Sequence, residues 1–279
     1  MTRNRRKELI KAIRSVYTQG INNVEILVVD NDSEDGTTEM LFRDYPDIRV
    51  IRLPKNLGCP GGRNHVYANS SGDYIVNLDD DGFLGEGALQ LLIETFESDH
   101  SIGIVGMRQC YPGEPPPDGF DNKSPLETGH FLGGVSAFRR QMLEEIGLYP
   151  EDFFFSKEEE YLDIKAMDAG YKIIFHPDII MWHPRNREMV STNDSREYYL
   201  YRNPLLVVIR LFPGWYLWKY LIARIISYAL VSLRRKSIGK YLKAVGYALF
   251  SLPMTLLKRH PCSSEAVRKY FRLRGVGQK

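Results

Sequence analysis

The chain has 279 residues, of which 43% are hydrophobic and 26% are charged. These values are typical of a soluble globular protein, and they exclude a wholly disordered chain, a collagen and a multi-pass membrane protein. The three scattered cysteines form neither a disulfide framework nor a CxxC metal site, which favours a reducing compartment.

The net charge of +2 conceals two regions of opposite charge. Residues 201–279 contain 16 Lys and Arg and a single acidic residue, whereas residues 1–200 contain 21 basic and 34 acidic residues. The first region therefore carries a charge of +15 and the second a charge of −13. We infer an acidic body followed by a basic tail, each with its own task.

The first 82 residues alternate between helical and strand patterns. Residues 1–6 are basic, but no apolar segment follows them, so they do not form a secretory signal. Apolar residues at helical spacing predict a helix over residues 7–19, and no strand is predicted ahead of it. Short β-branched runs predict strands over residues 25–30, 49–53 and 74–78, with helices over 37–44 and 63–70 between them.

The same alternation continues after residue 82. The patterns predict a helix over residues 86–97, a strand over 102–107, a helix that ends at Gly170 and a strand over 171–175. Strands that alternate with helices at this spacing predict an α/β fold, with a mostly parallel mixed sheet flanked by helices.

Acidic side chains follow two of the predicted strands. Asp30 and Asp32 end the first strand, and Asp79 and Asp81 follow the third. In a sheet of this kind, ligands bind outside the carboxyl ends of the strands. Neighbouring carboxylates repel one another, and a divalent cation such as Mg²⁺ or Mn²⁺ relieves that repulsion. The pattern therefore indicates a metal site, with a solvated acidic turn as the alternative.

A second acidic cluster, residues 157–163, opens the helix that ends at Gly170 and follows three consecutive phenylalanines. Acidic residues in a first helical turn stabilise a helix by themselves. The functional alternative is that one of these carboxylates is a general base, with a pKa raised by its aromatic neighbours. His183 follows the next strand, and a lone histidine is more often structural than a ligand.

Taken in order, these segments resemble the family 2 glycosyltransferases, which are inverting enzymes of the GT-A fold. The resemblance covers residues 2–205, about three quarters of the chain. It rests on the helix that ends at Gln19, the strand and turn Glu25–Thr37, Asn56–Gly58 with Gly61–Asn64, the DxD-like Leu78–Asp81, Gly133–Gly134 with Ala137–Arg140, and Glu158–Glu159 with Leu162, Lys165 and Gly170.

The resemblance implies a Rossmann-like GT-A catalytic domain over residues 1–203, with a nucleotide-binding half up to about residue 82 and an acceptor half after it. It also implies a role for each matching residue. Asp30, Asp32, Arg63, Asp79 and Asp80 would bind the donor nucleotide; Asp81 and His183 would hold Mn²⁺ or Mg²⁺; Glu159 would be the catalytic base; and Gly133, Gly134 and Glu158 would line the acceptor side.

The chain departs from the family pattern in several places. The family's first strand would precede Thr2, so we expect an upstream start, and the alternative is an inactive paralogue. Glu159 stands where Asp is common, and Lys165 stands where Arg is common. The segment 196–203 resembles rhamnosyl- and galactosyltransferase-like members. The sequence has no QxxRW motif of processive synthases, which favours transfer of a single sugar.

The basic tail, residues 204–279, contains two apolar stretches, 204–233 and 241–257. Charges interrupt the first and the second is short, whereas a spanning helix needs about 20 apolar residues. Trp215 and Trp218 beside basic residues predict amphipathic helices on an anionic membrane surface. The alternative is a helical subdomain packed on the catalytic domain. No recognised motif supports binding to nucleic acid.

These features together predict an inverting, metal-dependent glycosyltransferase of cell-surface polysaccharide synthesis. Its donor would be a nucleotide-diphosphate sugar and its acceptor a hydroxyl of a glycan or lipid-linked molecule. It would be cytoplasmic and peripheral on the inner face of the cell membrane. A nucleotidylyltransferase has a similar sheet but needs a glycine-rich, basic N-terminal loop, which the sequence lacks. An inactive scaffold that binds sugar nucleotides or membranes is the remaining alternative.

Overall fold

The computed structural model describes residues 1–114, 125–184 and 194–275. The strands are β1 (Leu27–Asp30), β2 (Arg49–Arg52), β3 (Tyr74–Leu78), β4 (Phe83–Leu84), β5 (Ile102–Cys110), β6 (Leu126–Glu127), β7 (Val135–Arg139) and β8 (Lys172–Trp182). The helices are α1 (Arg6–Tyr17), α2 (Thr37–Asp44), α3 (Gly58–Asn69), α4 (Ala88–Ser98), α5 (Arg140–Ile146), α6 (Glu158–Asp168), α7 (Asp194–Leu211), α8 (Gly214–Arg234), α9 (Ile238–Lys258) and α10 (Ser264–Leu273).

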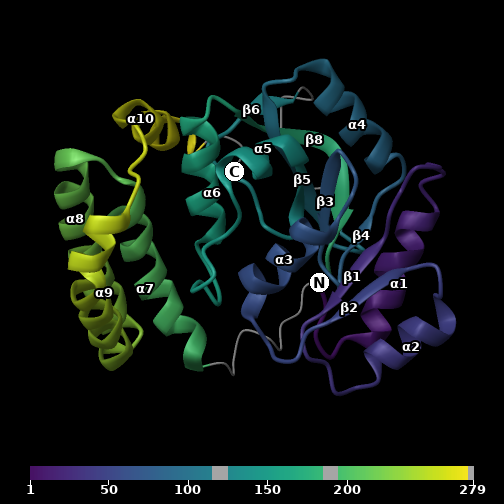
Figure 1. The fold of residues 1–279 in the computed structure, drawn as a ribbon, viewed down its shortest axis with the longest axis horizontal. Coiled ribbons are helices and arrows are strands. Elements are labelled where there is room, and N and C mark those ends of the chain that lie inside the picture. The colour runs from purple at the N-terminus through teal and green to yellow at the C-terminus, as the bar shows by residue number, and fades with distance from the viewer. Residues whose placement is uncertain (115–124, 185–193, 276–279) are drawn as a thin grey trace.

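The strands form two sheets. β1 and β2 pair in parallel, with Leu27 opposite Arg49 and Asp30 opposite Arg52. The larger sheet has the order β3-β7-β5-β8-β4, with β6 paired to β8. Figure 1 shows α1, α2 and α4 at one side of the strands and α5 and α6 at the other. The predicted α/β fold, a mixed sheet flanked by helices, is confirmed.

The prediction that the sheet is mostly parallel needs correction. Antiparallel pairing joins β7 to both β3 and β5, and it joins β4 and β6 to β8. Of the described pairs in the larger sheet, β5 with β8 is parallel. A parallel pair needs a long crossover, usually a helix, between its strands. No described helix separates β5 from β6 and β7, so these strands are free to pair antiparallel.

A cavity of about 520 Å³ lies between the two sheets. Leu27 and Val28 of β1 line one wall and the strand β3 lines the other, with apolar side chains of α1 and α4 closing the space. Met1 lines the cavity, and the next residue, Thr2, forms a one-residue parallel bridge to β1: the Thr2 amide donates to Val29 O, and the Asn31 amide donates to Thr2 O, both at 2.9 Å. Among the described residues, no strand joins β1 to β3.

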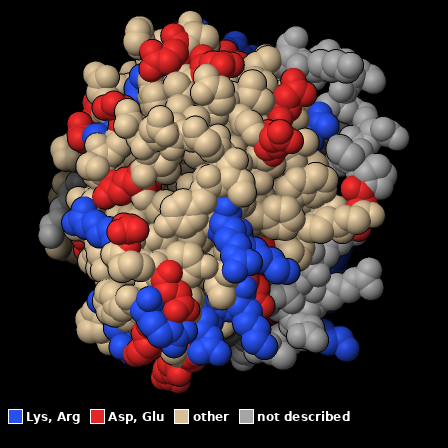
Figure 2. Space-filling view, turned by 90° about the vertical axis from the view of Figure 1, so that its right-hand side faces the viewer, with Lys and Arg blue, Asp and Glu red and all other residues tan. Residues whose placement is uncertain are grey.

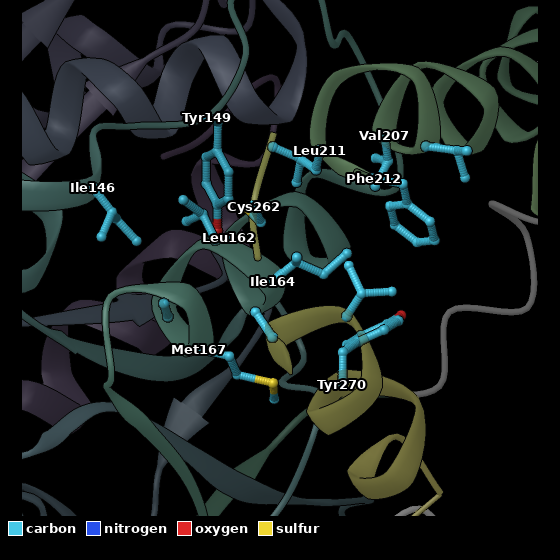
Figure 3. Close-up of a cluster of buried hydrophobic side chains, with 14 of the residues drawn as sticks. Ile146, Tyr149, Leu162, Ile164, Met167, Val207, Leu211, Phe212, Cys262 and Tyr270 are labelled. Carbon is cyan, nitrogen blue, oxygen red and sulfur yellow. The ribbon is translucent and has the colours of Figure 1, made fainter. Parts of the chain in front are cut away.

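The C-terminal helices pack against the body. α7 is continuous through residue 203, where a domain boundary was predicted. Figure 1 shows α7, α8 and α9 together beside α6, while α10 returns toward α6. Leu162 and Ile164 of α6 lie in one buried cluster with Phe212 and Tyr270 (Figure 3). Within the described residues, α8 is long and apolar enough to cross a membrane by length and composition.

The side of the molecule that carries α1 and α2 shows charges of both signs (Figure 2). Basic side chains gather in the lower part of this view with acidic ones among them, and uncharged residues occupy the middle. The negative charge of residues 1–200 is therefore not collected into one patch on this face.

Candidate active site

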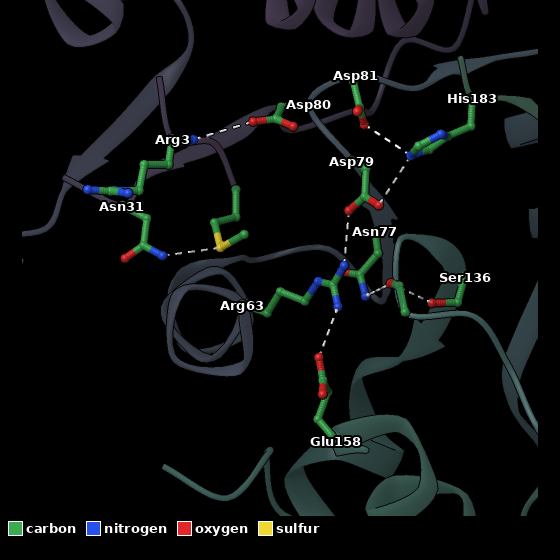
Figure 4. Close-up of polar contacts among 12 residues, drawn as sticks. Arg3, Asn31, Arg63, Asn77, Asp79, Asp80, Asp81, Ser136, Glu158 and His183 are labelled. Atoms are coloured by element: carbon green, nitrogen blue, oxygen red, sulfur yellow. Dashed lines mark hydrogen bonds and ion pairs between the residues drawn. The ribbon is translucent and has the colours of Figure 1, made fainter. Parts of the chain in front are cut away.

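Three side chains near the ends of β3 and β8 form the centre of the site. Asp79 and Asp81 follow β3, and His183 follows β8. His183 Nε2 lies 3.0 Å from Asp81 Oδ1 and 3.9 Å from Asp79 Oδ2 (Figure 4). One ligand atom of each residue lies within 4.8 Å of the other two. Carboxylates are the ligands that Mg²⁺ and Mn²⁺ prefer, and imidazole is a common nitrogen donor to metals. The donor set therefore fits the predicted cation.

Neighbouring groups set the charges of this cluster. Burial acts to raise the pKa of Asp81, but hydrogen bonds from His183 and Arg5 lower it to about 2. The hydrogen bond to Asp81 in turn raises the pKa of His183. Burial raises the pKa of Asp80 to about 6, although Arg5 Nη1 lies 3.6 Å from its carboxylate. Asp81 is therefore ionised at neutral pH, as a metal ligand must be.

Arg63 of α3 connects the acidic cluster to α6. Its side chain is buried, its Nη2 donates to Asp79 Oδ1 at 3.0 Å, and its Nη1 lies 3.8 Å from Glu158 Oε1 (Figure 4). Burial opposes the charge of Arg63, but Asp79 and other partners keep its pKa well above the ordinary value. A permanent positive charge therefore lies between the acidic cluster and the first turn of α6.

Gly133 and Gly134 allow these groups to approach one another. A Cβ atom on Gly134 would lie 1.8 Å from Asp79 Oδ2. A Cβ atom on Gly133 would lie 2.5 Å from both Arg63 Nη1 and Glu159 Oε1. A larger residue at either position would therefore displace a charged group of the site. The two glycines, predicted for the acceptor side, lie between the acidic cluster and Glu159.

The first turn of α6 presents three glutamates in different surroundings. Glu158 is 3% exposed, and burial, together with the nearby Glu159, raises its pKa to about 8. Glu160 is also buried and pairs with Arg224 of α8. Glu159 is partly exposed and has no ion-pair partner among the described residues. It is therefore the one of the three best placed to accept a proton from a bound molecule, and its assignment as base stays a prediction.

Asp30 is the last residue of β1 and Asp32 lies in the turn after it, and no described contact joins them to the acidic cluster. Asp30 is fully buried, and its carboxylate accepts hydrogen bonds from the Ser33 amide at 2.9 Å and from the Thr38 hydroxyl. Asp32 has a left-handed φ of 71°. The Asp30 carboxylate thus holds the turn together, and the predicted nucleotide contacts of both residues stay predictions.

The loop ahead of α6 is held by α7. Ser156 and Lys157 both have φ of 71°, a conformation that residues other than glycine rarely adopt. Asn203 of α7 is buried, and its Nδ2 donates to the carbonyl oxygens of Phe155 and Ser156 at 2.9 and 2.8 Å. These bonds fix the place where α6 begins, and with it the position of the three glutamates.

Arg5 and the pair of His130 with Asp163 form contacts in or beside the site that the sequence did not reveal. Arg5 forms an ion pair with Asp81. His130 Nδ1 lies 2.7 Å from Oδ2 of the fully buried Asp163, whose pKa burial raises to about 7. Asp163 follows Glu159 by four residues, so both lie on one face of α6. That spacing was the available signal, whereas the pairing of His130 with α6 left none.

Known proteins resemble this chain in sequence. The sequence model of the family "Glycosyl transferase family 2" matches residues 1–147, more than half of the chain. Glycosyltransferase AglE of Haloferax volcanii is 28% identical over 196 residues, which are 65% of this chain and 64% of that protein. The GalNAc(5)-diNAcBac-PP-undecaprenol beta-1,3-glucosyltransferase of Campylobacter jejuni is 35% identical over 97 residues, 33% of this chain and 31% of that protein. The chain thus spans less than two thirds of the length of these relatives.

Solved structures share the fold at low sequence identity. TarS 1–349 of S. aureus in complex with UDP-GlcNAc has a TM-score of 0.67 at 16% identity, over 91% of this chain and 80% of that one. The mannosyltransferase PcManGT from Pyrobaculum calidifontis, in complex with GDP-Man and Mn²⁺, has a TM-score of 0.59 at 18% identity, over 97% of this chain and 76% of that one. The fold is therefore GT-A. By its sequence match and its fold, the chain belongs to glycosyl transferase family 2.

Proposed function

We propose that this chain is an inverting glycosyltransferase that moves a single sugar from a nucleotide-diphosphate sugar to a hydroxyl of a glycan or lipid-linked acceptor in cell-surface polysaccharide synthesis. The observation that carries the proposal is that Arg63 contacts both Asp79 and Glu158. This contact brings the metal-ligating group against the first turn of α6. A departing diphosphate needs positive charge and an attacking hydroxyl needs a base, and the two sides of Arg63 offer these two environments.

On the donor side, Asp79, Asp81 and His183 would hold Mn²⁺ or Mg²⁺, which when bound supplies positive charge to the diphosphate. Arg63 adds a guanidinium that stays protonated at any working pH. It stabilises the charge that develops as the bond between the anomeric carbon and the diphosphate oxygen breaks. Asp80 is proposed to contact the donor nucleotide beside this group.

On the acceptor side, Glu159 takes the proton of the acceptor hydroxyl as its oxygen attacks the anomeric carbon from the face opposite the diphosphate. One displacement of this kind inverts the anomeric configuration. A positioned base contributes typically about 10²–10⁴-fold to the rate. Glu158 is protonated at neutral pH because its pKa is raised to about 8, so it adds no second negative charge beside the base.

The names of the relatives support the donor and acceptor classes. The Campylobacter relative is named for an undecaprenol-linked acceptor, and the solved neighbours hold UDP-GlcNAc and GDP-Man. The resemblance of segment 196–203 to rhamnosyltransferase-like members adds deoxyhexoses such as rhamnose to the candidate donor sugars. An enzyme with a lipid-linked acceptor would work as a cytoplasmic, peripheral protein on the inner face of the membrane.

An inactive paralogue that only binds nucleotide-sugars is the second candidate. The cavity between β1 and β3 favours it, because that cavity adjoins Asp79 and Asp80 and leaves the edge of β3 unsupported on that side. We propose that a further strand fills this space in the active protein. The two candidates differ in turnover and not in binding.

The first test is a thermal-shift panel of nucleoside diphosphates and nucleotide-sugars, with and without Mn²⁺. A rise in melting temperature that requires Mn²⁺ and is specific to one nucleotide would establish the donor site, because a ligand stabilises the state that it binds. Absence of any shift across uridine, guanosine and deoxythymidine donors would contradict both candidates.

The second test compares Glu159→Gln with the wild type and with Glu144→Gln, an exposed control on α5. Release of the diphosphate from the donor identified in the panel is followed with water or alkyl glycosides as acceptors. We expect Glu159→Gln to lose at least 100-fold in rate and to keep its thermal shift with the donor. A wild-type protein that binds but never releases diphosphate would favour the inactive paralogue.

A further inference from the structure

We propose that the outer faces of α8 and α9 form a single docking surface that lies flat on an anionic lipid bilayer. The two helices are consecutive, separated by residues 235–237, and lie side by side (Figure 1). The proposal concerns a surface remote from the chemistry of sugar transfer. It rests on the peripheral membrane location in the proposed function and names the surface responsible; its test needs no turnover, so its failure would leave the proposed sugar transfer untouched.

Both helices expose large apolar side chains, along one stripe on α8 and over a broader face on α9. On α8 these are Trp215, Trp218, Ile222, Ile226, Leu230 and Leu233, and on α9 they are Ile238, Leu242, Leu249, Phe250, Met254 and Leu257. Neighbours on α8 are three or four residues apart, so they share one face of the helix. Phe250 is 88% exposed. An apolar face of this many large exposed side chains marks a site of interaction with a protein or a membrane.

The positive charge around these apolar faces favours an anionic lipid surface as the partner. Residues 214–258 contain eight Lys and Arg and no Asp or Glu. Arg234, Arg235 and Lys236 are exposed at the turn between the two helices, and Lys219 is exposed beside the tryptophans. Basic residues at the edge of an apolar face complement anionic headgroups, and tryptophan is favoured at the depth of the headgroups.

The inner faces of the same helices show that α8 lies along the surface and does not cross it. Leu217 and Leu221 of α8 are buried against the body. Arg224 of α8 pairs with the buried Glu160 of α6 and donates to the carbonyl oxygen of Pro204. A spanning α8 would have to break these contacts and leave Glu160 without this partner. The length and composition of α8 therefore suit a helix that packs one face against the protein and places the other face in the lipid.

The same packing relates the docking surface to the site. Arg224 reaches from the inner face of α8 to Glu160, which adjoins Glu159 in the first turn of α6. In a molecule docked through α8 and α9, the helix α6, which carries Glu159, is thus held by a contact from a helix that rests on the membrane.

The test is co-sedimentation of the full chain with vesicles of phosphatidylcholine alone and with vesicles that also contain phosphatidylglycerol. We expect at least tenfold tighter binding to the anionic vesicles, weakened by added salt. The double variant Ile222→Glu, Ile226→Glu should bind at least tenfold more weakly with an unchanged melting temperature. Phe42→Glu, which alters an equally exposed side chain on α2, should bind like the wild type.

Quenching of tryptophan fluorescence by brominated lipids then measures depth, with quenching expected from bromine near the headgroups. The proposal would be overturned by no vesicle binding, by equal binding to both vesicle types, by binding that the double variant retains, or by quenching from the bilayer centre with resistance to alkaline extraction. Sedimentation velocity tests whether a second copy of the chain, and not a membrane, covers this surface. A dimer that the double variant abolishes would assign the surface to contact between two copies of the chain.

Discussion

The substitution Gly134→Ala adds one methyl group at the centre of the site. Its Cβ would lie 1.8 Å from Asp79 Oδ2, whereas ordinary van der Waals contact begins near 3.4 Å. The Asp79 carboxylate must therefore retreat by roughly 1.6 Å. It is the far end of a side chain, so it can move without displacing backbone. The fold should survive, but the 3.0 Å bond from Arg63 to Asp79 and the approach of His183 should not.

The expected result is weaker binding of Mn²⁺ and nucleotide with little change in stability. Misplacing groups that support a metal typically costs about 10–100-fold in affinity, or roughly 1.4–2.7 kcal/mol. Isothermal titration with Mn²⁺ and the nucleotide identified by thermal shift measures this loss directly. Gly246→Ala is the matched control, because a Cβ at that position in α9 meets nothing within 4 Å.

Two outcomes would refute this reasoning. Wild-type affinity in Gly134→Ala would show that the position of Asp79 is unimportant for binding. The second outcome is weak binding in Gly134→Ala together with wild-type affinity in Asp79→Ala, which removes the carboxylate without crowding. It would show that displacement of the Asp79 carboxylate does not cause the weaker binding.

Three further predictions concern stability. The pKa of Glu158 is about 8 in the folded protein and near 4.5 in the unfolded chain, so the folded state retains a proton that the unfolded state releases between these values. Glu158 should therefore make stability fall as pH rises from 4.5 to 8, by up to about 1.4 kcal/mol per pH unit. The raised pKa values of Asp80 and Asp163 add slopes of the same sign, so Glu158→Gln should reduce, without abolishing, the loss of stability between pH 5 and pH 8 in urea denaturation; an unchanged slope would contradict it. Arg224→Met should destabilise the protein by about 3–5 kcal/mol because it leaves Glu160 buried without its main partner, and the double variant with Glu160→Met should recover most of that loss; a cycle with no coupling would show that the pair is unimportant. Fusing five alternating apolar residues ahead of Met1 should fill the cavity between β1 and β3 and raise the melting temperature by roughly 5 °C or more, whereas an extension of Gly and Ser should not; equal effects would mean that the cavity does not take a strand.

The sequence by itself determined the alternation of helices and strands and the main chemical groups. Local patterns suffice for both, because β-branched runs such as Leu27–Val29 and the acidic residues after β3 carry their signal within a few positions. The order of the matching segments was enough to predict the family, which the match over residues 1–147 confirms.

Only the tertiary structure showed that Glu159 is the one of three adjacent glutamates without an ion-pair partner among the described residues. Glu158, Glu159 and Glu160 are alike in sequence, but Arg63 approaches the first and Arg224 pairs with the third, from α3 and α8. Such partners lie 64 or more residues away along the chain, and no local pattern encodes them. The mainly antiparallel pairing of the larger sheet and the pairing of His130 with Asp163 were likewise fixed by packing, because they depend on which surfaces meet when the chain folds.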